Sequence, residues 1–174
     1  MISPRLCALA TTLALLVAGP AFAERRVSIM VDPIFLVVPM VDATVEVEPT
    51  PHLGLSATAG YGRVAVLIPN AMYNLQLESN VYLFRPFQGW HLGTELAYWG
   101  GSSGGALFPG GPKTMDSTSS IYIAGIMGGY KWMTRGGFTA VIQYGVGRMH
   151  ETSTSGGTKN ELAPLANLNF GWSL

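Results

Sequence analysis

The stretch NLNFGWSL, residues 167–174, alternates between two kinds of side chain without interruption. A period of two is the pattern of a β-strand, because successive side chains of a strand point to opposite faces of the sheet. One face here is polar or small and the other apolar and aromatic: Asn167, Asn169, Gly171 and Ser173 against Leu168, Phe170, Trp172 and Leu174. The class of fold depends on which face points inward and which solvent the other face meets.

Residues 1–23 have the layout of a cleavable export signal. Arg5 supplies a basic charge, residues 6–18 form an apolar run, and Ala21-Phe22-Ala23 ends the segment with the small residues that signal peptidase accepts. The run is shorter than the roughly 20 residues with which a helix crosses a bilayer. We therefore expect export, removal of residues 1–23 and a mature domain of residues 24–174.

The composition excludes several classes of protein. Ten Lys and Arg balance ten Asp and Glu, and no basic cluster is present, so nucleic acid is not an expected partner. Only 11% of residues are charged, against about 25% in an ordinary soluble domain. The single cysteine, Cys7, lies in the expected signal, which leaves the mature domain without a disulfide or a thiol site. No stretch after residue 23 suits a membrane helix, so this glycine-rich exported chain indicates a barrel or sandwich of strands.

Period-two alternation recurs along the mature domain and predicts eight strands. Most are near the roughly 9–11 residues that a tilted membrane strand needs. We place them at 27–38, 41–48, 53–62, 71–83, 90–99, 120–132, 138–148 and 162–174. Pro33 lacks a ladder donor and predicts a bulge or irregular pairing in the first strand. Residues 120–132 are apolar on both faces, and we assign one row so that aromatic residues lie at both ends: Tyr122, Ala124, Ile126, Gly128, Tyr130 and Trp132.

The predicted connections alternate in length. Residues 49–52, 85–89 and 133–137 are short and turn-like. The connections between them are longer and polar or glycine-rich, at 62–70, 100–120 and 150–161; only the first connection, near Pro39, breaks this order by being short. Short turns at one rim and long loops at the other are typical of an outer-membrane barrel, with the turns in the periplasm. An even number of strands then places both termini on the periplasmic side.

Eight alternating strands also suit a soluble, lipocalin-like barrel, which turns its apolar row inward. Three features favour the membrane barrel, which turns that row toward lipid. The polar row is rich in small residues that fit the crowded interior of an eight-stranded barrel, and we expect the barrel to end on its last strand, at Leu174. Aromatic residues also lie at both ends of the apolar row, as at membrane interfaces: Tyr61, Tyr73, Trp90, Tyr98, Tyr122, Tyr130, Trp132, Phe138 and Trp172. We predict an all-β, eight-stranded antiparallel up-and-down transmembrane barrel in a bacterial outer membrane.

The alternating end of the chain resembles the assembly signal of bacterial outer-membrane barrels, with Leu174 where phenylalanine is usual. That resemblance implies recognition by the barrel assembly machinery. In addition, residues 31–62, 89–99, 128–147 and 162–174 are similar to a family of small outer-membrane β-barrels of unknown function. This second resemblance covers most of the mature domain and implies a fold and a location, without catalytic residues.

The chemistry of the expected interior centres on His91 and Glu95, which are four residues apart and therefore on one face of a strand. A histidine beside a carboxylate can act as an acid–base pair, which raises the alternative of a lipid-modifying outer-membrane enzyme. Such an enzyme also needs a serine or histidine dyad at the lipid-facing rim, and the sequence assigns no partner to Ser56 or Ser173. The simpler interpretation is a structural network of enclosed acids and their partners, since an unpaired buried charge is costly. The acids are Asp42, Glu46, Glu48, Glu78 and Glu95, and the candidate partners are His91, Lys131 and Arg25 or Arg26.

No residue pattern predicts a metal or a cofactor. The histidines, at 52, 91 and 150, fall on different elements, and the glycine-rich residues 100–113 lack the helix that follows a phosphate loop. We therefore predict no enzyme activity, no cofactor and a lumen filled by side chains. The expected partners are outer-membrane lipids and the assembly machinery. Any further recognition is expected in the loops at 100–119 and 150–161, whose composition specifies no ligand. A soluble periplasmic carrier remains the other alternative.

Overall fold

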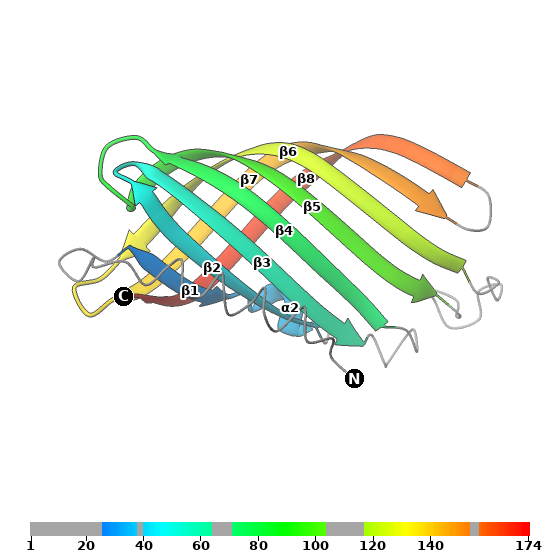
Figure 1. Cartoon of the computed structure of the whole chain (residues 1–174), viewed down its shortest axis with the longest axis horizontal. Helices are drawn as coiled ribbons and strands as arrows, with labels where there is room; N and C mark the ends of the chain where they lie inside the picture. Colours follow the sequence, from blue (N-terminus) through cyan, green and yellow to red (C-terminus); the bar gives the residue numbers. More distant parts are fainter. Residues whose placement is uncertain (1–25, 38–39, 64–70, 104–116, 154–156) are drawn as a thin grey trace.

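The protein is a closed β-barrel, described by a computed structural model for residues 26–37, 40–63, 71–103, 117–153 and 157–174 (Figure 1). Eight antiparallel strands follow one another around the ring: β1 (Val27–Val31), β2 (Met40–Thr50), β3 (Leu53–Arg63), β4 (Ala71–Tyr82), β5 (Gly89–Ser103), β6 (Ser117–Met133), β7 (Phe138–Ser153) and β8 (Gly157–Ser173). A four-residue helix, α2 (Ile34–Val37), follows β1. Within these ranges no helix is long and apolar enough to cross a membrane. The predicted eight-stranded up-and-down barrel is confirmed, while the expected signal at residues 1–23 lies outside the described residues.

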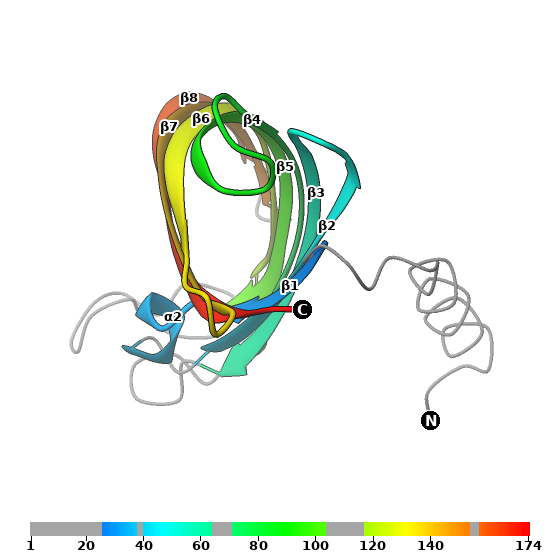
Figure 2. The ribbon, with the colours of Figure 1, turned by 90° about the vertical axis from the view of Figure 1, so that its left-hand side faces the viewer.

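Each strand pairs with its neighbours in the chain, and β8 pairs with β1 to close the ring. The tight connections β2–β3, β4–β5 and β6–β7 lie together with the C-terminus at one end of the barrel, here called the turn end (Figures 1 and 2). The opposite end, where β3, β5 and β7 finish, is called the far end. His52, Phe87, Gly89 and Gly137 have positive φ values in the three connections. Phe87 is the residue for which this backbone is most costly, because its side chain is bulky.

The apolar rows point outward and the polar rows inward, as the alternation predicts. On β2, Asp42, Thr44 and Glu46 are buried whereas Val41 and Val45 are exposed. The row that was ambiguous in the sequence follows the predicted phase: Tyr122, Ile126 and Trp132 are exposed on β6, and Lys131 between them is buried. The largest exposed apolar side chains lie on every strand and include Leu77 at 61%, Leu92 at 60%, Leu96 at 62% and Ile126 at 64% exposure.

Aromatic side chains on the outer surface form two bands. Near the far end, Tyr73, Tyr98 and Tyr122 contact one another in sequence across β4, β5 and β6, with ring centroids 5.8 and 5.0 Å apart. Near the turn end, Trp90 contacts Tyr130, which contacts Trp132 at 4.5 Å, and Phe138 contacts Trp172 at 5.5 Å. The outer surface between these bands is mainly aliphatic, and it includes Tyr144 on β7.

The first strand is shorter than the expected 27–38. β1 ends at Val31, and the chain continues through Asp32 and Pro33 into α2. Proline has no N–H to continue the ladder, and the Asp32 carboxylate accepts a hydrogen bond from the Ile34 N–H at 2.8 Å, which starts the helical turn. The expected bulge is therefore a complete termination of the strand.

The last strands are longer than expected. Residues 150–161 were assigned to a loop, but β7 continues to Ser153 and β8 begins at Gly157. The ladder includes His150↔Asn160 and Glu151↔Lys159, and Lys159 pairs with Glu161 at 2.5 Å. Polar residues continue the strand pairing here because cross-strand pairs stabilise a sheet whether they are apolar or polar. Similarly, β5 continues to Ser103 and β6 starts at Ser117, within the expected loop 100–119.

Candidate functional site

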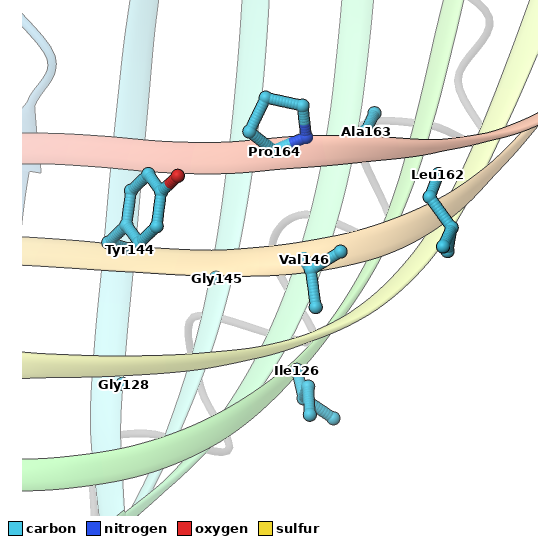
Figure 3. Close-up of a pocket in the computed structure, with 8 residues that line it drawn as sticks. All are labelled: Ile126, Gly128, Tyr144, Gly145, Val146, Leu162, Ala163 and Pro164. Carbon is cyan, nitrogen blue, oxygen red and sulfur yellow. The ribbon is translucent and has the colours of Figure 1, made fainter.

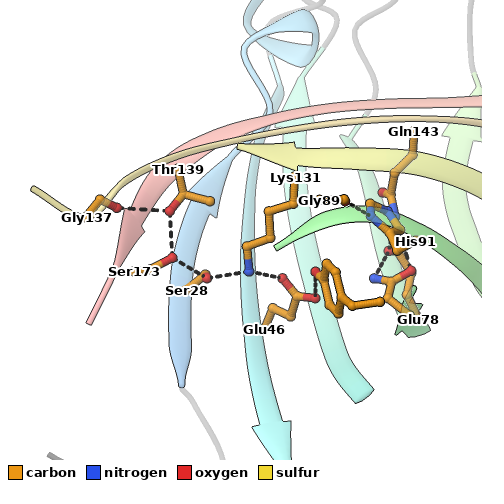
Figure 4. A network of polar contacts seen from close by, with 12 residues as sticks. Ser28, Glu46, Glu78, Gly89, His91, Lys131, Gly137, Thr139, Gln143 and Ser173 are labelled. Carbon is orange, nitrogen blue, oxygen red and sulfur yellow. Dashed lines mark hydrogen bonds and ion pairs between the residues drawn. The ribbon is translucent and has the colours of Figure 1, made fainter. Parts of the chain in front are cut away.

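A buried lysine is the centre of the polar network inside the barrel (Figure 4). Lys131 points inward from β6, and its Nζ donates to Glu46 Oε2 on β2 at 2.7 Å and to Ser28 Oγ on β1 at 2.8 Å. The relative exposures of the two charged side chains are 0% and 2%. The Nζ atom also lies 3.2 Å from the centre of the Phe87 ring, an attractive cation–π geometry. The lysine therefore has a partner for its charge and holds three strands together.

A relay of hydroxyl groups extends from Lys131 to the seam between β1 and β8. Ser28 Oγ lies 2.7 Å from Ser173 Oγ, which lies 2.6 Å from Thr139 Oγ1. Thr139 donates to the Gly137 carbonyl at 2.9 Å. Because the single hydroxyl proton of Thr139 goes to the Gly137 carbonyl, Ser173 donates to Thr139 and Ser28 donates to Ser173. Such chains strengthen cooperatively. The relay joins β7, β8 and β1 at the turn end.

The connection between β4 and β5 folds an aromatic pair into the barrel beside this lysine. The Tyr82 hydroxyl donates to Glu46 Oε1 at 2.6 Å, so both oxygens of this carboxylate are occupied. Phe87 is 1% exposed and its ring lies edge-on to Tyr82. The positive φ of Phe87, 56°, turns its ring inward rather than toward solvent. Strained backbone of this kind persists only where the surrounding packing stabilises it.

His91 contacts amide and backbone groups rather than a carboxylate. Its Nδ1 lies 3.3 Å from the Gly89 carbonyl and its Nε2 lies 3.1 Å from Gln143 Nε2. With Gln143 as the donor, His91 Nε2 accepts and Nδ1 carries the proton, which is the neutral form of the ring. The acid–base pair of His91 and Glu95, which the sequence raised only as an alternative, therefore does not form in this structure. The two residues share a face of β5, but His91 is turned toward the turn end, where its ring also packs on Tyr82.

Three glutamates form a row across neighbouring strands in the middle of the barrel. Glu46 lies opposite Ser56, Ser56 opposite Glu78, and Glu78 opposite Glu95. Glu78 accepts hydrogen bonds from amide groups rather than from cations: from Gln143 at 3.2 Å, Asn167 at 3.1 Å and Asn80 at 3.4 Å. Asp42 likewise accepts from Asn74 at 3.0 Å.

The sequence therefore identified the acids and Lys131 correctly but missed the amides as their partners. The alternation of residues 167–174 placed Asn167 and Asn169 on the polar face, so part of the signal was present. Matching acids with bases could not find these partners, because an amide group is neutral and still donates hydrogen bonds to a carboxylate. Arg25 lies outside the described residues.

Several acceptor atoms in the interior have no hydrogen-bond partner among the described residues. They are Glu95 Oε2, Ser56 Oγ, Asp42 Oδ1 and Asn74 Oδ1. The last two converge where a side chain on Gly60 would lie. Buried acceptors of this kind bind donors such as water or a ligand group.

Among the described residues, no interior serine forms a hydrogen bond with a histidine. Ser28 accepts a hydrogen bond from Lys131, which also donates to Glu46, so the lysine acts as a donor in this contact. Ser173 contacts two other hydroxyl groups, and Ser56 has no partner. In the same part of the chain, no three His, Cys, Asp or Glu side chains are placed to hold a metal ion.

The fold and this interior define a class: an eight-stranded antiparallel barrel with a charged, hydrogen-bonded interior and an apolar exterior. Comparison with known proteins adds no family to this class, because no family model, curated protein or solved structure matches the chain.

Proposed function

We propose that this protein is a small integral barrel of a bacterial outer membrane, without enzyme activity. The observation that carries the proposal is the inverted distribution of side chains: ions and amides are buried inside, and large aliphatic side chains are exposed outside. In water, such an exterior would be an apolar patch far larger than the few hundred Å² usual for a soluble monomer. Hydrocarbon is the solvent that stabilises it.

The spacing of the two aromatic bands also supports an outer face that lies in hydrocarbon. On β6, Tyr122 and Trp132 belong to the two bands and are ten residues apart (132 − 122), both exposed. Ten residues extend about 33 Å along a strand, or about 25 Å along the barrel axis at a tilt of about 40°. The apolar layer of outer-membrane barrels is about 25 Å tall. The tyrosine band then lies at one interface and the band with Trp90, Tyr130, Trp132 and Trp172 at the other, where rings with a polar tip are favoured.

The polar interior counts against a lipocalin-like carrier. Sites for apolar ligands are lined mainly by apolar and aromatic side chains, whereas the interior here contains the buried charged residues Lys131, Glu46 and Glu95. The tightly hydrogen-bonded network near the turn end supports a lumen closed by side chains rather than a diffusion pore. Its most buried members include Tyr82, Phe87, Lys131, His91 and Glu46, all at 2% exposure or less.

In this proposal the turn end faces the periplasm, and the far end projects from the cell surface. The ends of β7 and β8 extend past the tyrosine band as a polar hairpin with exposed Thr152, Thr158 and Lys159. The role of the barrel is then structural, or it consists of contacts made by these projecting strands. The assembly machinery and outer-membrane lipids are the proposed partners.

Outer-membrane fractionation with heat-modifiable gel mobility tests the proposal. A folded barrel stays with the outer membrane after osmotic shock and migrates differently in a gel before and after boiling. Release by osmotic shock without detergent, as a soluble protein, would contradict it.

Two further measurements test the remaining parts. Purified protein in a planar bilayer is expected to give no steady conductance, and a stable open channel would overturn the closed lumen.

Incubation with phospholipid or lipopolysaccharide is expected to leave acyl composition unchanged. Acyl transfer or hydrolysis that is lost in His91→Ala would instead support the enzyme alternative.

A further inference from the structure

The ring of strands is closed, but toward the far end no described strand lies hydrogen-bonded between β2 and β8. β1 closes the ring through only four residue pairs, from Ser28↔Ser173 to Val31↔Phe170. Beyond them, residues 157–169 of β8 pair only with β7, and residues 40–42 of β2 pair only with β3, within the described part of the chain. The missing strand is the half of β1 that Pro33 prevents.

The chain turns inward where β1 ends. Asp32 Oδ2 accepts from the Leu168 N–H of β8 at 3.4 Å, in place of the next backbone acceptor of β1. The helix α2 follows, and its Phe35 ring lies 5.5 Å from the inward-facing Trp99 on β5, four strands away around the ring. The last side-chain contact between β2 and β8 is Thr44 with Asn169, at 3.5 Å. These residues border, on the turn-end side, the unpaired region between residues 40–42 of β2 and residues 157–169 of β8, here called the break.

The free edge of β8 is polar yet protected from pairing with another strand. The Leu174 and Leu168 N–H groups both point toward β1, so residues an even number of positions away, Leu162, Pro164 and Ala166, direct their backbone groups toward the break. Pro164 has no N–H to donate, and a proline at a sheet edge disfavours addition of a further strand. The remaining N–H and C=O groups need polar partners, because unsatisfied backbone in hydrocarbon costs several kcal/mol per group.

Apolar surface leads to the break from outside (Figure 3). A groove of about 530 Å³ runs over the outer face of β6, β7 and β8 as far as this edge. Gly128 leaves room in it, and its sides include Ile126, Tyr144, Leu162 and Pro164, without a charged residue. The groove has the chemistry of a site for an acyl chain.

The inner side of the break is apolar beside β8 and polar beside β2. Leu165 points inward and packs over Gly125 and Gly147, where a side chain on either glycine would collide with it. Met40 on β2 is 3% exposed. Next to it, Asp42 Oδ1 is a buried acceptor without a hydrogen-bond partner among the described residues. A polar headgroup with donors would complement this acceptor and the backbone carbonyls of the β8 edge.

We propose that this break is a lateral opening, through which the acyl chain of a membrane amphiphile with a donor-bearing headgroup passes between the lipid and the far half of the lumen. The proposal rests on the membrane location proposed above. The acyl chain occupies the outer groove and the break, while the headgroup meets the β8 edge and Asp42. The hydrogen-bonded turn end closes the route to the other side, so the opening connects only the lipid and the far end.

Photo-crosslinking from the lipid tests the opening. The mature protein is reconstituted in phosphatidylcholine vesicles containing a phosphatidylethanolamine with a diazirine on its acyl chain, whose ammonium is the donor-bearing headgroup. After irradiation, labelled residues are mapped by mass spectrometry. The expected result is labelling of the inward-facing Leu165, Met40 and Phe35 in addition to outward-facing Leu75 and Leu77. Labelling confined to outward-facing residues would overturn the opening while leaving the membrane location intact.

A pair of variants tests whether the route is the break itself. Ala166→Phe places a ring on the free edge of β8 and is expected to reduce inward labelling severalfold. Ala57→Phe places the same ring on the outer face of β3, away from the break, and is expected to leave it unchanged. Equal inward labelling in both variants, or crosslinked dimers through β8 in place of lipid adducts, would contradict the proposal. Absence of label on Leu75 and Leu77 as well would contradict the membrane location itself.

Discussion

Lys131 and Glu46 form an ion pair of 2.7 Å inside the barrel, and neither side chain is more than 2% exposed. The two residues come from β6 and β2, on different sides of the ring, so the pair spans the lumen. Removing one member leaves an uncompensated buried charge, which is more costly than removing both.

Lys131→Met is therefore expected to lower the free energy of unfolding by about 3–5 kcal/mol. Urea titration of the barrel refolded in lipid vesicles measures this value. The double variant Lys131→Met with Glu46→Gln has no isolated charge and is expected to recover part of the loss. A double variant less stable than Lys131→Met alone would contradict the pairing.

The cost in folding free energy of a charge introduced on the outer surface shows whether that surface meets hydrocarbon or water. Ile126 lies between the aromatic bands at 64% exposure, and Ile126→Arg is expected to cost about 2–4 kcal/mol of folding free energy in vesicles. Asn160→Arg, at the level of the tyrosine band, is the control and is expected to cost about 0–1 kcal/mol. If both variants were as stable as the unmodified protein, the outer face would meet water.

The seam between β1 and β8 depends on a glycine. A side chain at Gly171 would lie 2.6 Å from Met30 Cα and also collide with the Ile29 carbonyl, both of them backbone atoms that cannot rotate away. Gly171→Ala is expected to cost about 1–3 kcal/mol, seen as a lower temperature of the heat-modifiable gel shift. Gly157→Ala, where nothing lies within 4 Å, is the matched control and should leave that temperature unchanged. Equal temperatures for the two variants would count against the seam.

The Asp32 carboxylate is expected to protect two amides at the end of β1. Asp32→Ala removes the acceptors of the Ile34 and Leu168 N–H groups, so both amides should exchange with deuterium faster in detergent micelles. Asp32→Asn retains one acceptor oxygen and should restore part of the protection. Unchanged exchange at Leu168 in Asp32→Ala would show that another group closes this part of the seam.

Alternation alone predicted most of the fold. The rows around Val41, Leu55, Leu75 and Ile142 point outward as expected, because a period of two fixes the two faces of a strand independently of its neighbours. The end of β1 was not predictable to the residue, since it depends on the Asp32 side chain reaching Leu168 across the seam. That contact is between residues far apart in the sequence.

The interior was predicted less completely than the wall. Burial of Glu46, Glu78, Glu95 and Lys131 followed from the phase of the strands. Which of them meet depends on the register around the ring and on the length of each side chain, and alternation specifies neither. His91 therefore contacts Gln143 on β7 rather than Glu95 on its own strand.

Site-directed spin labels at Leu55, Leu96 and Ile142 test the orientation of the barrel most directly. These side chains are 43%, 62% and 48% exposed on the outer face. In reconstituted vesicles, we expect high collision rates with oxygen and low rates with a water-soluble nickel chelate at all three positions, as for side chains in hydrocarbon. Ready access of the nickel chelate, or exclusion of both reagents as in a dry protein core, would contradict it.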